Sequence, residues 1–261
     1  MTSIAARRRH PLATAALVLL GLLITGVVYA AAMPGQADAA SGTTSADVQA
    51  GRKLFLANCS TCHGMNAEGR DNAPSLVGVG SAAVDFQVGT GRMPLAASGP
   101  QAPKAPVRLN TTEISQLAAY VASLGPGPAT PDSATVNPEA GDASRGNAIF
   151  RTNCAMCHNS AGKGGALTRG KYAPNLTGVT PTHIYEAMVT GPQSMPVFND
   201  MTLNPQAKRD VIAYLTEVNE TPNPGGFSLG RLGPVSEGLV GWVVGLGLCI
   251  GAAVWLGSKS A

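Results

Sequence analysis

Aromatic and charged side chains are both scarce in this sequence. Of its 261 residues, 5% are Phe, Trp or Tyr and 13% are Asp, Glu, Lys or Arg, whereas Gly (32) and Pro (19) are abundant. So few aromatic rings exclude a large aromatic core, and the interior then needs some filling other than side chains. The formal net charge of +3, with 18 basic and 15 acidic residues, argues against a nucleic-acid-binding protein.

Charge is absent from two long apolar runs, one near each end of the chain. The first, residues 12–32, would form a helix about 31 Å long, enough to cross the apolar part of a bilayer. Three arginines at positions 7–9 precede it, so the positive-inside rule predicts a cytoplasmic segment over residues 1–11. A secretory signal peptide fits the same residues, because alanines at 30–32 offer a cleavage site.

The second apolar run, residues 239–256, predicts a transmembrane helix over 235–257. Trp242 and Trp255 lie near its two ends, as in an aromatic belt, and Lys259 follows in a tail of four residues, 258–261, predicted to be cytoplasmic. The glycines of this run suit helix packing in lipid better than the alternative, a buried hairpin of a soluble domain. We therefore expect a multi-pass protein of the cell membrane with the intervening residues on the outer face.

Four of the five cysteines occur in two Cys-x-x-Cys-His motifs, and the fifth, Cys249, lies in the second apolar run. This spacing is that of covalent c-type heme, in which two thiols form thioethers with the vinyl groups and the adjacent imidazole binds the iron. The predicted thioether donors are Cys59, Cys62, Cys154 and Cys157. The predicted proximal ligands are His63 and His158, so the sequence predicts two covalently bound hemes c. A zinc site, a thioredoxin-like dithiol and structural disulfides are the competing interpretations.

Each heme needs a sixth ligand, and methionine is the usual choice for electron transfer. In the first half, Met65 is too close to His63 to reach the distal face, which leaves Met93. In the second half, the candidates are Met188, Met195, Met201 and the imidazole of His183.

An internal repeat narrows this choice. Cys154 lies 95 positions after Cys59, and the preceding Gly, Phe and Asn recur at the same offset. The second half has five extra residues around 163–172, and after them an Ala-Pro pair recurs at an offset of 100, at 73–74 and 173–174. Met195-Pro196 then matches Met93-Pro94, because both pairs follow a Thr-Gly pair. The repeat favours Met195 over His183.

These matched residues resemble the class I cytochrome c family, twice over. The resemblance implies an all-α chain with tandem cytochrome c domains at 47–124 and 142–220, joined by a linker at 125–141 and followed by another at 221–234. It also implies that the carbonyls of Pro74 and Pro174 accept hydrogen bonds from His63 and His158 respectively. An insert at 98–106 in the first half is interpreted as a tolerated surface insertion or a docking loop.

Two c-type modules between two membrane segments resemble the diheme cytochrome c subunit of actinobacterial cytochrome bc complexes. That resemblance implies a Rieske iron-sulfur subunit and a cytochrome b subunit as partners, with a terminal heme-copper oxidase in the same supercomplex. The whole complex would be a proton-translocating quinol–cytochrome c oxidoreductase, in which this chain carries electrons and has no catalytic residues. Three alternatives remain: a free-standing tethered electron carrier, a c-type subunit of a heme-copper oxidase and a diheme peroxidase. The second apolar run disfavours the oxidase subunit, and the two methionines disfavour the peroxidase.

Overall fold

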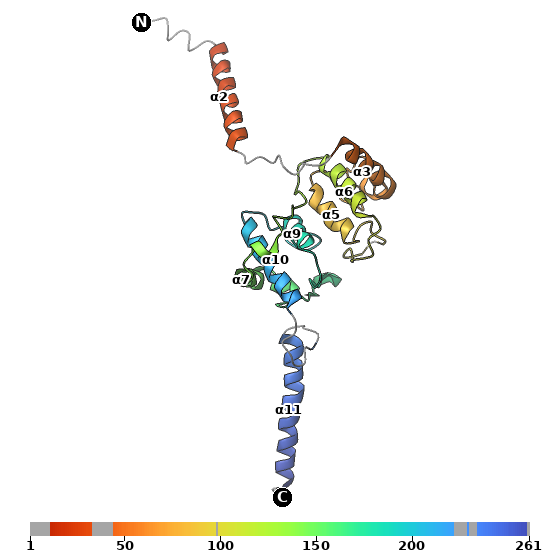
Figure 1. Ribbon diagram of the computed structural model, residues 1–261, viewed down its shortest axis with the longest axis vertical. Helices are drawn as coiled ribbons and strands as arrows, with labels where there is room; N and C mark the ends of the chain where they lie inside the picture. Colours follow the sequence, from red (N-terminus) through yellow and green to blue (C-terminus); the bar gives the residue numbers. More distant parts are fainter. Residues whose placement is uncertain (1–10, 33–43, 98, 222–228, 230–233, 260–261) are drawn as a thin grey trace, which may run out of the picture. The chain divides into compact units, whose positions relative to one another are not determined.

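The structure is a computed structural model that describes residues 11–32, 44–97, 99–221, 229 and 234–259. The chain divides into two units, Met1–Thr43 and Thr44–Ala261. Helix α2 (Pro11–Ala32) belongs to the first, and all the other elements belong to the second (Figure 1). In chain order these are α3 (Ser45–Asn58), α4 (Ser60–His63), α5 (Gly80–Gly89), α6 (Thr111–Ala122), the 3₁₀ turn η1 (Pro138–Ala140), α7 (Ala143–Asn153), α8 (Ala155–His158), β1 (Gly165–Ala166), η2 (Thr168–Gly170), β2 (Tyr172–Ala173), α9 (Pro181–Thr190), α10 (Pro205–Glu220) and α11 (Pro234–Lys259).

The first helical module is built on the contact between α3 and α6. Gly51 of α3 lies where the two helices meet, and a Cβ there would come within 1.9 Å of the backbone oxygen of Gln116. One turn later, the rings of Phe55 and Tyr120 pack with their centroids 5.3 Å apart. A side chain larger than hydrogen at position 51 would therefore separate the two helices that carry this aromatic pair.

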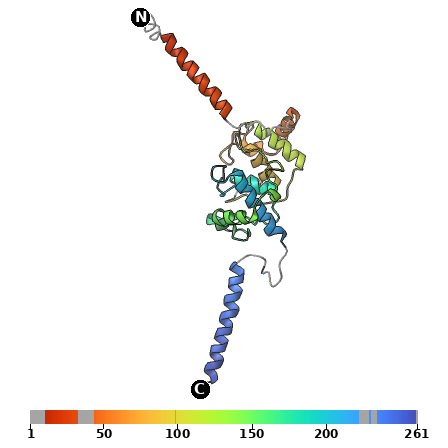
Figure 2. The same ribbon diagram turned by 60° about the vertical axis from the view of Figure 1, so that its left-hand side comes forward.

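The second module repeats this crossing with α7 and α10 (Figures 1 and 2). A Cβ at Gly146 would lie 1.9 Å from the backbone oxygen of Asp210, and the rings of Phe150 and Tyr214 are 5.4 Å apart. The residues that match between the two halves of the sequence thus make the same contacts in both modules. The buried hydrophobic residues of the described chain form two clusters, one within each module.

The close approach at Gly146 leads to a stability prediction. Gly146→Ala should destabilise the second module by about 1–3 kcal/mol or more, because the clashing atom belongs to the backbone of α10 and cannot rotate away. Thermal unfolding followed by circular dichroism measures the effect. Gly99→Ala is the matched control, since its added Cβ would lie 3.8 Å from the Gln101 oxygen, an ordinary van der Waals contact. Equal melting temperatures for the two variants would contradict the tight crossing.

A buried carboxylate also joins α7 to α10. Asp210 is fully buried and accepts hydrogen bonds from the guanidinium of Arg145 (2.5 and 3.0 Å), the backbone N–H of Asp142 (2.9 Å) and the side-chain amide of Gln206 (3.0 Å). Burial by itself raises the pKa of Asp210, but these hydrogen bonds outweigh it and the pKa lies below its ordinary value of 3.8. The ionised form is therefore the one that the fold stabilises.

Because the folded-state pKa of Asp210 is depressed, its contribution to stability is present above the unfolded value of 3.8 and lost as the pH falls through the folded value. We expect Asp210→Asn to lower the melting temperature at neutral pH and to flatten the loss of stability below about pH 4. Melting curves between pH 2 and pH 7 provide the measurement. A variant whose acid sensitivity equals that of the native chain would show that Asp210 is not the group responsible.

The extra segments of the two modules contact each other. The extra residues of the second half form a short antiparallel pair, β1 and β2, with Gly165 opposite Ala173. The side-chain amide of Gln101, in the insert of the first half, donates to the Tyr172 oxygen (2.9 Å) and accepts from its N–H (2.8 Å). Ala102 donates its N–H to the side chain of Gln193 (3.2 Å). The described part of the insert is thus a contact with the second module.

The linker at 125–141 is more ordered than its Pro- and Gly-rich sequence predicts. The N–H of Ala82 donates to the Pro128 oxygen (3.1 Å), and Thr130 donates to the Ser81 hydroxyl (2.9 Å). Near its end, Val136 is buried in the core of the second module, and η1 follows. Composition describes only local flexibility, whereas these contacts come from residues far away in the sequence.

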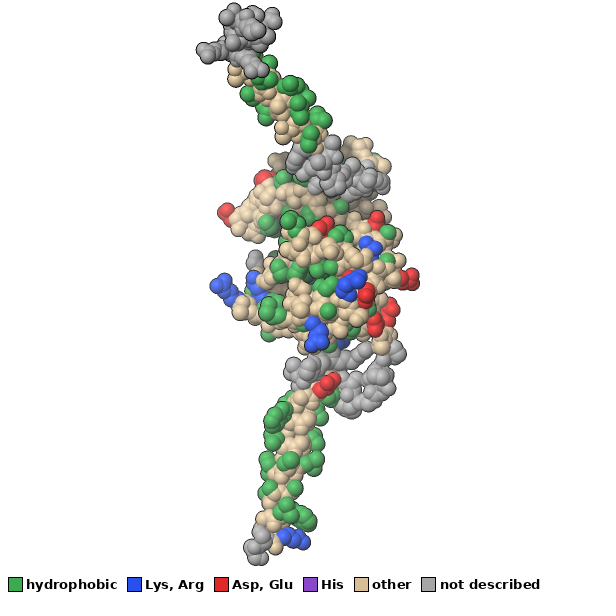
Figure 3. Space-filling view, turned by 90° about the vertical axis from the view of Figure 1, so that its left-hand side faces the viewer, with side chains coloured by type: hydrophobic (Ala, Val, Ile, Leu, Met, Phe, Trp, Pro, Cys, Tyr) green, Lys and Arg blue, Asp and Glu red, His purple; other side chains and the backbone are tan. Residues whose placement is uncertain are grey.

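Helix α11 is the only helix in the described residues that is long and apolar enough to cross a membrane, by length and composition. The candidate span is Ser236–Lys259, with a mean hydropathy of 2.2 and no part of it buried. On the face shown in Figure 3, its side chains are predominantly apolar. The apolar part of α2 that the structure describes is shorter, Leu12–Val28. The structure therefore supports one membrane helix at the C-terminal end.

Candidate heme-binding sites

Both Cys-x-x-Cys-His motifs fold into the same single helical turn. Cys59 ends α3, and its carbonyl accepts hydrogen bonds from the N–H groups of Cys62 (3.1 Å) and His63 (2.9 Å). The carbonyl of Cys154 accepts the two equivalent bonds, again at 3.1 and 2.9 Å. In each module the turn follows directly on the helix that carries the close-contact glycine. The helix crossing thereby fixes the position of each motif.

The carbonyl of a distant proline orients each motif histidine. The Nδ1 of His63 lies 2.8 Å from the Pro74 oxygen, and the Nδ1 of His158 lies 3.1 Å from the Pro174 oxygen. A carbonyl oxygen can only accept, so Nδ1 carries the proton in both rings and the lone pair of Nε2 is left available to a metal. Burial lowers the pKa of His158, although the Pro174 carbonyl opposes the shift. A neutral imidazole with an available Nε2 lone pair is what an iron ligand requires.

The motif cysteines carry free thiols in the structure, without disulfides. Burial, and then the neighbouring thiol of the same motif, raise the pKa of Cys59 and of Cys154 to about 11. A redox dithiol needs a thiol of lowered pKa, so these values disfavour the thioredoxin-like interpretation. Within the described residues, neither motif belongs to a cluster of three or more side chains placed to hold a metal ion, which disfavours zinc.

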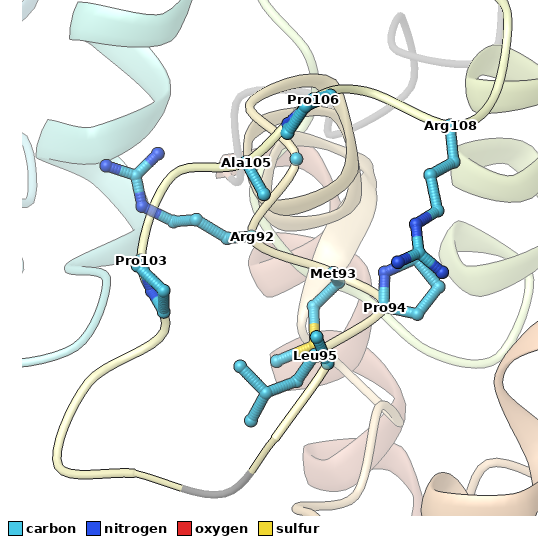
Figure 4. A pocket seen from close by; sticks show the side chains of 10 residues that line it. Arg92, Met93, Pro94, Leu95, Pro103, Ala105, Pro106 and Arg108 are labelled. Carbon is cyan, nitrogen blue, oxygen red and sulfur yellow. The ribbon is translucent and has the colours of Figure 1, made fainter.

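Burial separates the methionines that the structure describes into three groups. Three are largely exposed: Met65 (56%), Met156 (93%) and Met201 (97%). Met188 is 3% exposed, as expected for a residue that fills the core. Met93 and Met195 are partly buried, and each packs against the same hydrophobic cluster as the first cysteine of its module, Cys59 or Cys154. Figure 4 shows Met93 lying beside Leu95, with Arg92 pointing in a different direction.

His183, the rival ligand in the second half, contacts the other module. Its Nε2 lies 4.0 Å from Asp85, and its ring packs edge-on against Phe86 with the centroids 6.0 Å apart. Both partners belong to α5 of the first module. No feature of the sequence indicated these contacts, because they join segments about 100 residues apart.

The residues present in each module fit a covalently attached heme. The two thiols lie on one helical turn, beside an imidazole whose Nδ1 is hydrogen-bonded to a proline carbonyl. The methionine side chain packs against the same apolar cluster as the first cysteine. Nitrogen from histidine and sulfur from methionine are the axial donors of electron-transfer cytochromes. The apolar cluster supplies the low-polarity surroundings that such a group requires.

Comparison with known proteins agrees with this chemistry. The family model described as cytochrome c matches residues 48–125, and the one described as cytochrome C oxidase, cbb3-type, subunit III matches residues 141–215. Proteins named cytochrome bc1 complex cytochrome c subunit match nearly the whole chain. The protein from Corynebacterium efficiens is 44% identical over 97% of this chain and 90% of its own length, and that from Mycobacterium bovis is 43% identical over 97% and 93%.

The chain belongs to the family of cytochrome bc1 complex cytochrome c subunits. A third relative, from Mycobacterium leprae, is 42% identical over 94% of this chain and 87% of its own length. The resemblance inferred from the sequence is thus confirmed, as is a mostly helical chain with two cytochrome c domains. The family model of the oxidase subunit matches the second module, and an oxidase subunit from Sinorhizobium medicae, 30% identical, matches 49% of this chain, whereas the cytochrome bc1 relatives match 97% of it. As a cytochrome c subunit, the chain binds heme c and serves electron transport.

Proposed function

We propose that this chain is the membrane-anchored diheme subunit of a quinol–cytochrome c reductase and carries electrons from a Rieske iron-sulfur subunit to a terminal heme-copper oxidase. The observation that carries the proposal is the pair of equivalent Cys-x-x-Cys-His turns, each with its proline-bonded histidine. The nearly full-length similarity to cytochrome bc1 complex subunits supports the assignment to that complex.

Two covalently bound hemes c follow from this duplication. The residues proposed to form thioethers are Cys59, Cys62, Cys154 and Cys157. The residues proposed to hold the heme iron are His63 with Met93 in the first module and His158 with Met195 in the second, and Pro74 and Pro174 hold the two imidazoles. The heme supplies a one-electron change of its iron, with no substrate bond made or broken.

The protein's own groups determine how such a site behaves. The proline carbonyl fixes each imidazole and raises its basicity, which would favour the oxidised form of a bound iron, whereas a methionine ligand would favour the reduced form. His158 is 9% exposed, whereas His63 is less buried. The two sites therefore differ in their access to water, and we expect two separate reduction potentials.

Membrane topology is part of the proposal. Charges at both ends of the chain support two spans, over residues 12–32 and 235–257, with the segments 1–11 and 258–261 in the cytoplasm. The cytochrome c domains, 47–124 and 142–220, would then lie on the outer face, separated by the linker at 125–141, with the second linker at 221–234. An N-terminal segment that is cleaved as a signal peptide would leave α11 as the single anchor.

The partners would be the Rieske subunit, the cytochrome b subunit and, in a supercomplex, the oxidase. To test this, the tagged full-length chain is purified from native membranes in mild detergent, together with whatever stays bound, and mixed with a quinol. We expect rapid reduction of the c-type hemes that an inhibitor of quinol oxidation abolishes. Reduction that the inhibitor does not affect, or that needs a separate dehydrogenase, would instead indicate a free-standing carrier or an oxidase subunit.

A further inference from the structure

Three side chains meet where α5 of the first module packs against α9 of the second. Asp85 comes from α5, and His183 and Glu186 come from successive turns of α9. The Nε2 of His183 lies 4.0 Å from a carboxylate oxygen of Asp85 and 4.0 Å from one of Glu186. One ligand atom from each residue lies within 4.8 Å of the other two. None of these residues is among the proposed heme ligands.

Glu186 is the most informative of the three. Its side chain is fully buried, and neither carboxylate oxygen has a hydrogen-bond partner of acceptable geometry in the described part of the chain. Burial, and then the neighbouring carboxylate of Asp85, raise the pKa of Glu186 to about 10. A buried carboxyl group without partners is costly, so the site needs either a proton or a cation.

The repeat shows that packing does not require a carboxylate here. Position 186 corresponds to Phe86, which lies 100 positions earlier. In both modules the backbone carbonyl at this position accepts a hydrogen bond from the hydroxyl of the threonine four residues later, at 2.5 Å for Phe86 and 2.6 Å for Glu186. In the first module this position is thus filled by an aromatic ring, 6% exposed. The second module places an acid in the equivalent buried position, opposite another acid and an imidazole.

We propose that Asp85, His183 and Glu186 bind a divalent transition-metal ion of the Zn²⁺ type between the two modules. One imidazole nitrogen and two carboxylate oxygens are donors that Zn²⁺ accepts, with bonds of about 2.0–2.2 Å. The imidazole disfavours Ca²⁺ and Mg²⁺, which prefer oxygen ligands. In a tetrahedral site with bonds of this length the ligand atoms lie about 3.3 Å apart, so the 4.0 Å separations would have to shorten by about 0.7 Å through side-chain rotation.

The site is accessible and its imidazole is suited to a metal. The side chains of His183 and Asp85 are 21% and 27% exposed, so water can reach the ion and complete its coordination. Burial is the main cause that lowers the pKa of His183, opposed by Asp85 and supported by the charges of Lys104 and Arg92. The ring is therefore neutral at pH 7, as a ligand must be. The charges of the two cations oppose a bound metal, whereas those of the two carboxylates favour it.

Metal binding would release a proton, and this release can be measured. A Zn²⁺ ion that binds the carboxyl group of Glu186 displaces its proton to the solvent, and no electron is transferred. The ion would then connect α5 and α9, and with them the two modules. The competing arrangement is a proton shared between Asp85 and Glu186 without any metal.

The experiment uses the full-length chain with its hemes, purified in mild detergent and treated with a chelator. Equilibrium dialysis against Zn²⁺ at fixed free concentrations is followed by elemental analysis, with heme iron as the internal standard. We expect one tightly held zinc per chain in the native protein. Asp85→Asn, His183→Gln and Glu186→Gln should each lower zinc affinity by at least about 10-fold, as loss of even an outer partner of a metal ligand can do. Glu217→Gln, at an exposed acid of α10, is the matched control and should leave affinity unchanged.

The Glu186→Gln variant distinguishes a bound Zn²⁺ ion from a proton shared between Asp85 and Glu186. Gln has the shape of a protonated Glu, so this variant should keep the native heme spectrum and melting temperature while it loses zinc. Calorimetric titration in buffers of different ionisation enthalpy should also show proton release by the native chain and none by the variant. Equal zinc uptake by the native chain and Glu186→Gln at every free zinc concentration would overturn the proposal and support the shared proton.

Discussion

Replacement of both Cys59 and Cys62 by serine should remove the covalently bound heme of the first module and halve the heme c content of the chain. Serine cannot form the thioether bonds that hold a c-type heme. The buried hydrophobic residues form separate clusters in the two modules, so we expect the second site to retain its heme. Denaturing mass spectrometry and a pyridine hemochrome assay measure the content.

Cys249→Ser is the matched control for this experiment. Cys249 is exposed on α11, away from both motifs in the sequence, and its replacement should leave the heme content unchanged. The reciprocal variant, with Cys154 and Cys157 replaced, should also lose half of the heme. If the serine variant of the first motif kept two covalent hemes, the assignment of Cys59 and Cys62 would be wrong.

Met93→His should lower the reduction potential of the first heme by on the order of 0.1 V, since axial ligands together set heme potentials over a range of about 0.8 V. Imidazole donates more strongly than a thioether and stabilises the oxidised iron, whereas methionine raises the potential. The second heme should change little. An optical redox titration that resolves two components measures both potentials.

Met201→His provides the comparison, because Met201 is 97% exposed and the new imidazole would lie in solvent. We expect the titration of this variant to match that of the native chain. A parallel Met195→His variant should shift the other component. If Met93→His left both potentials unchanged, another residue would have to be the sixth ligand of the first heme.

Local spacing in the sequence predicted the chemistry of the sites well. The Cys-x-x-Cys-His motif needs only one helical turn, so its geometry is contained in five consecutive residues. The two close-contact glycines are also marked in the sequence, because the repeat matches Gly51 with Gly146, and both lie where a Cβ would clash. The roles of the axial ligands remain proposals, since they depend on the bound group itself.

Contacts between the modules could not be predicted from the sequence. The pairing of Gln101 with Tyr172 joins two insertions that look like independent surface loops when each is considered alone. His183 appeared to be an isolated histidine, and its partner Asp85 belongs to the other module. The composition of the linker likewise did not indicate that Val136 is buried. In each case the deciding partner is distant in the sequence and neither local pattern identifies it.

The two apolar segments differ in how well the sequence described them. For α11, the length, the apolar composition and the helix all agree with a membrane span. For α2, the helix Pro11–Ala32 forms as expected, and its described apolar part is Leu12–Val28. Edman sequencing of the mature N-terminus distinguishes an uncleaved anchor from a signal peptide.

The most direct test of the whole account is a reduced pyridine hemochrome spectrum of the tagged full-length chain, purified from its native membranes in mild detergent. One spectrum reports the types of heme present and their ratio. We predict c-type heme at two per chain, together with b-type heme from the cytochrome b subunit. Recovery of c-type heme alone, from membranes in which cross-linking also captures no b-type cytochrome, would contradict a role in the cytochrome bc1 complex.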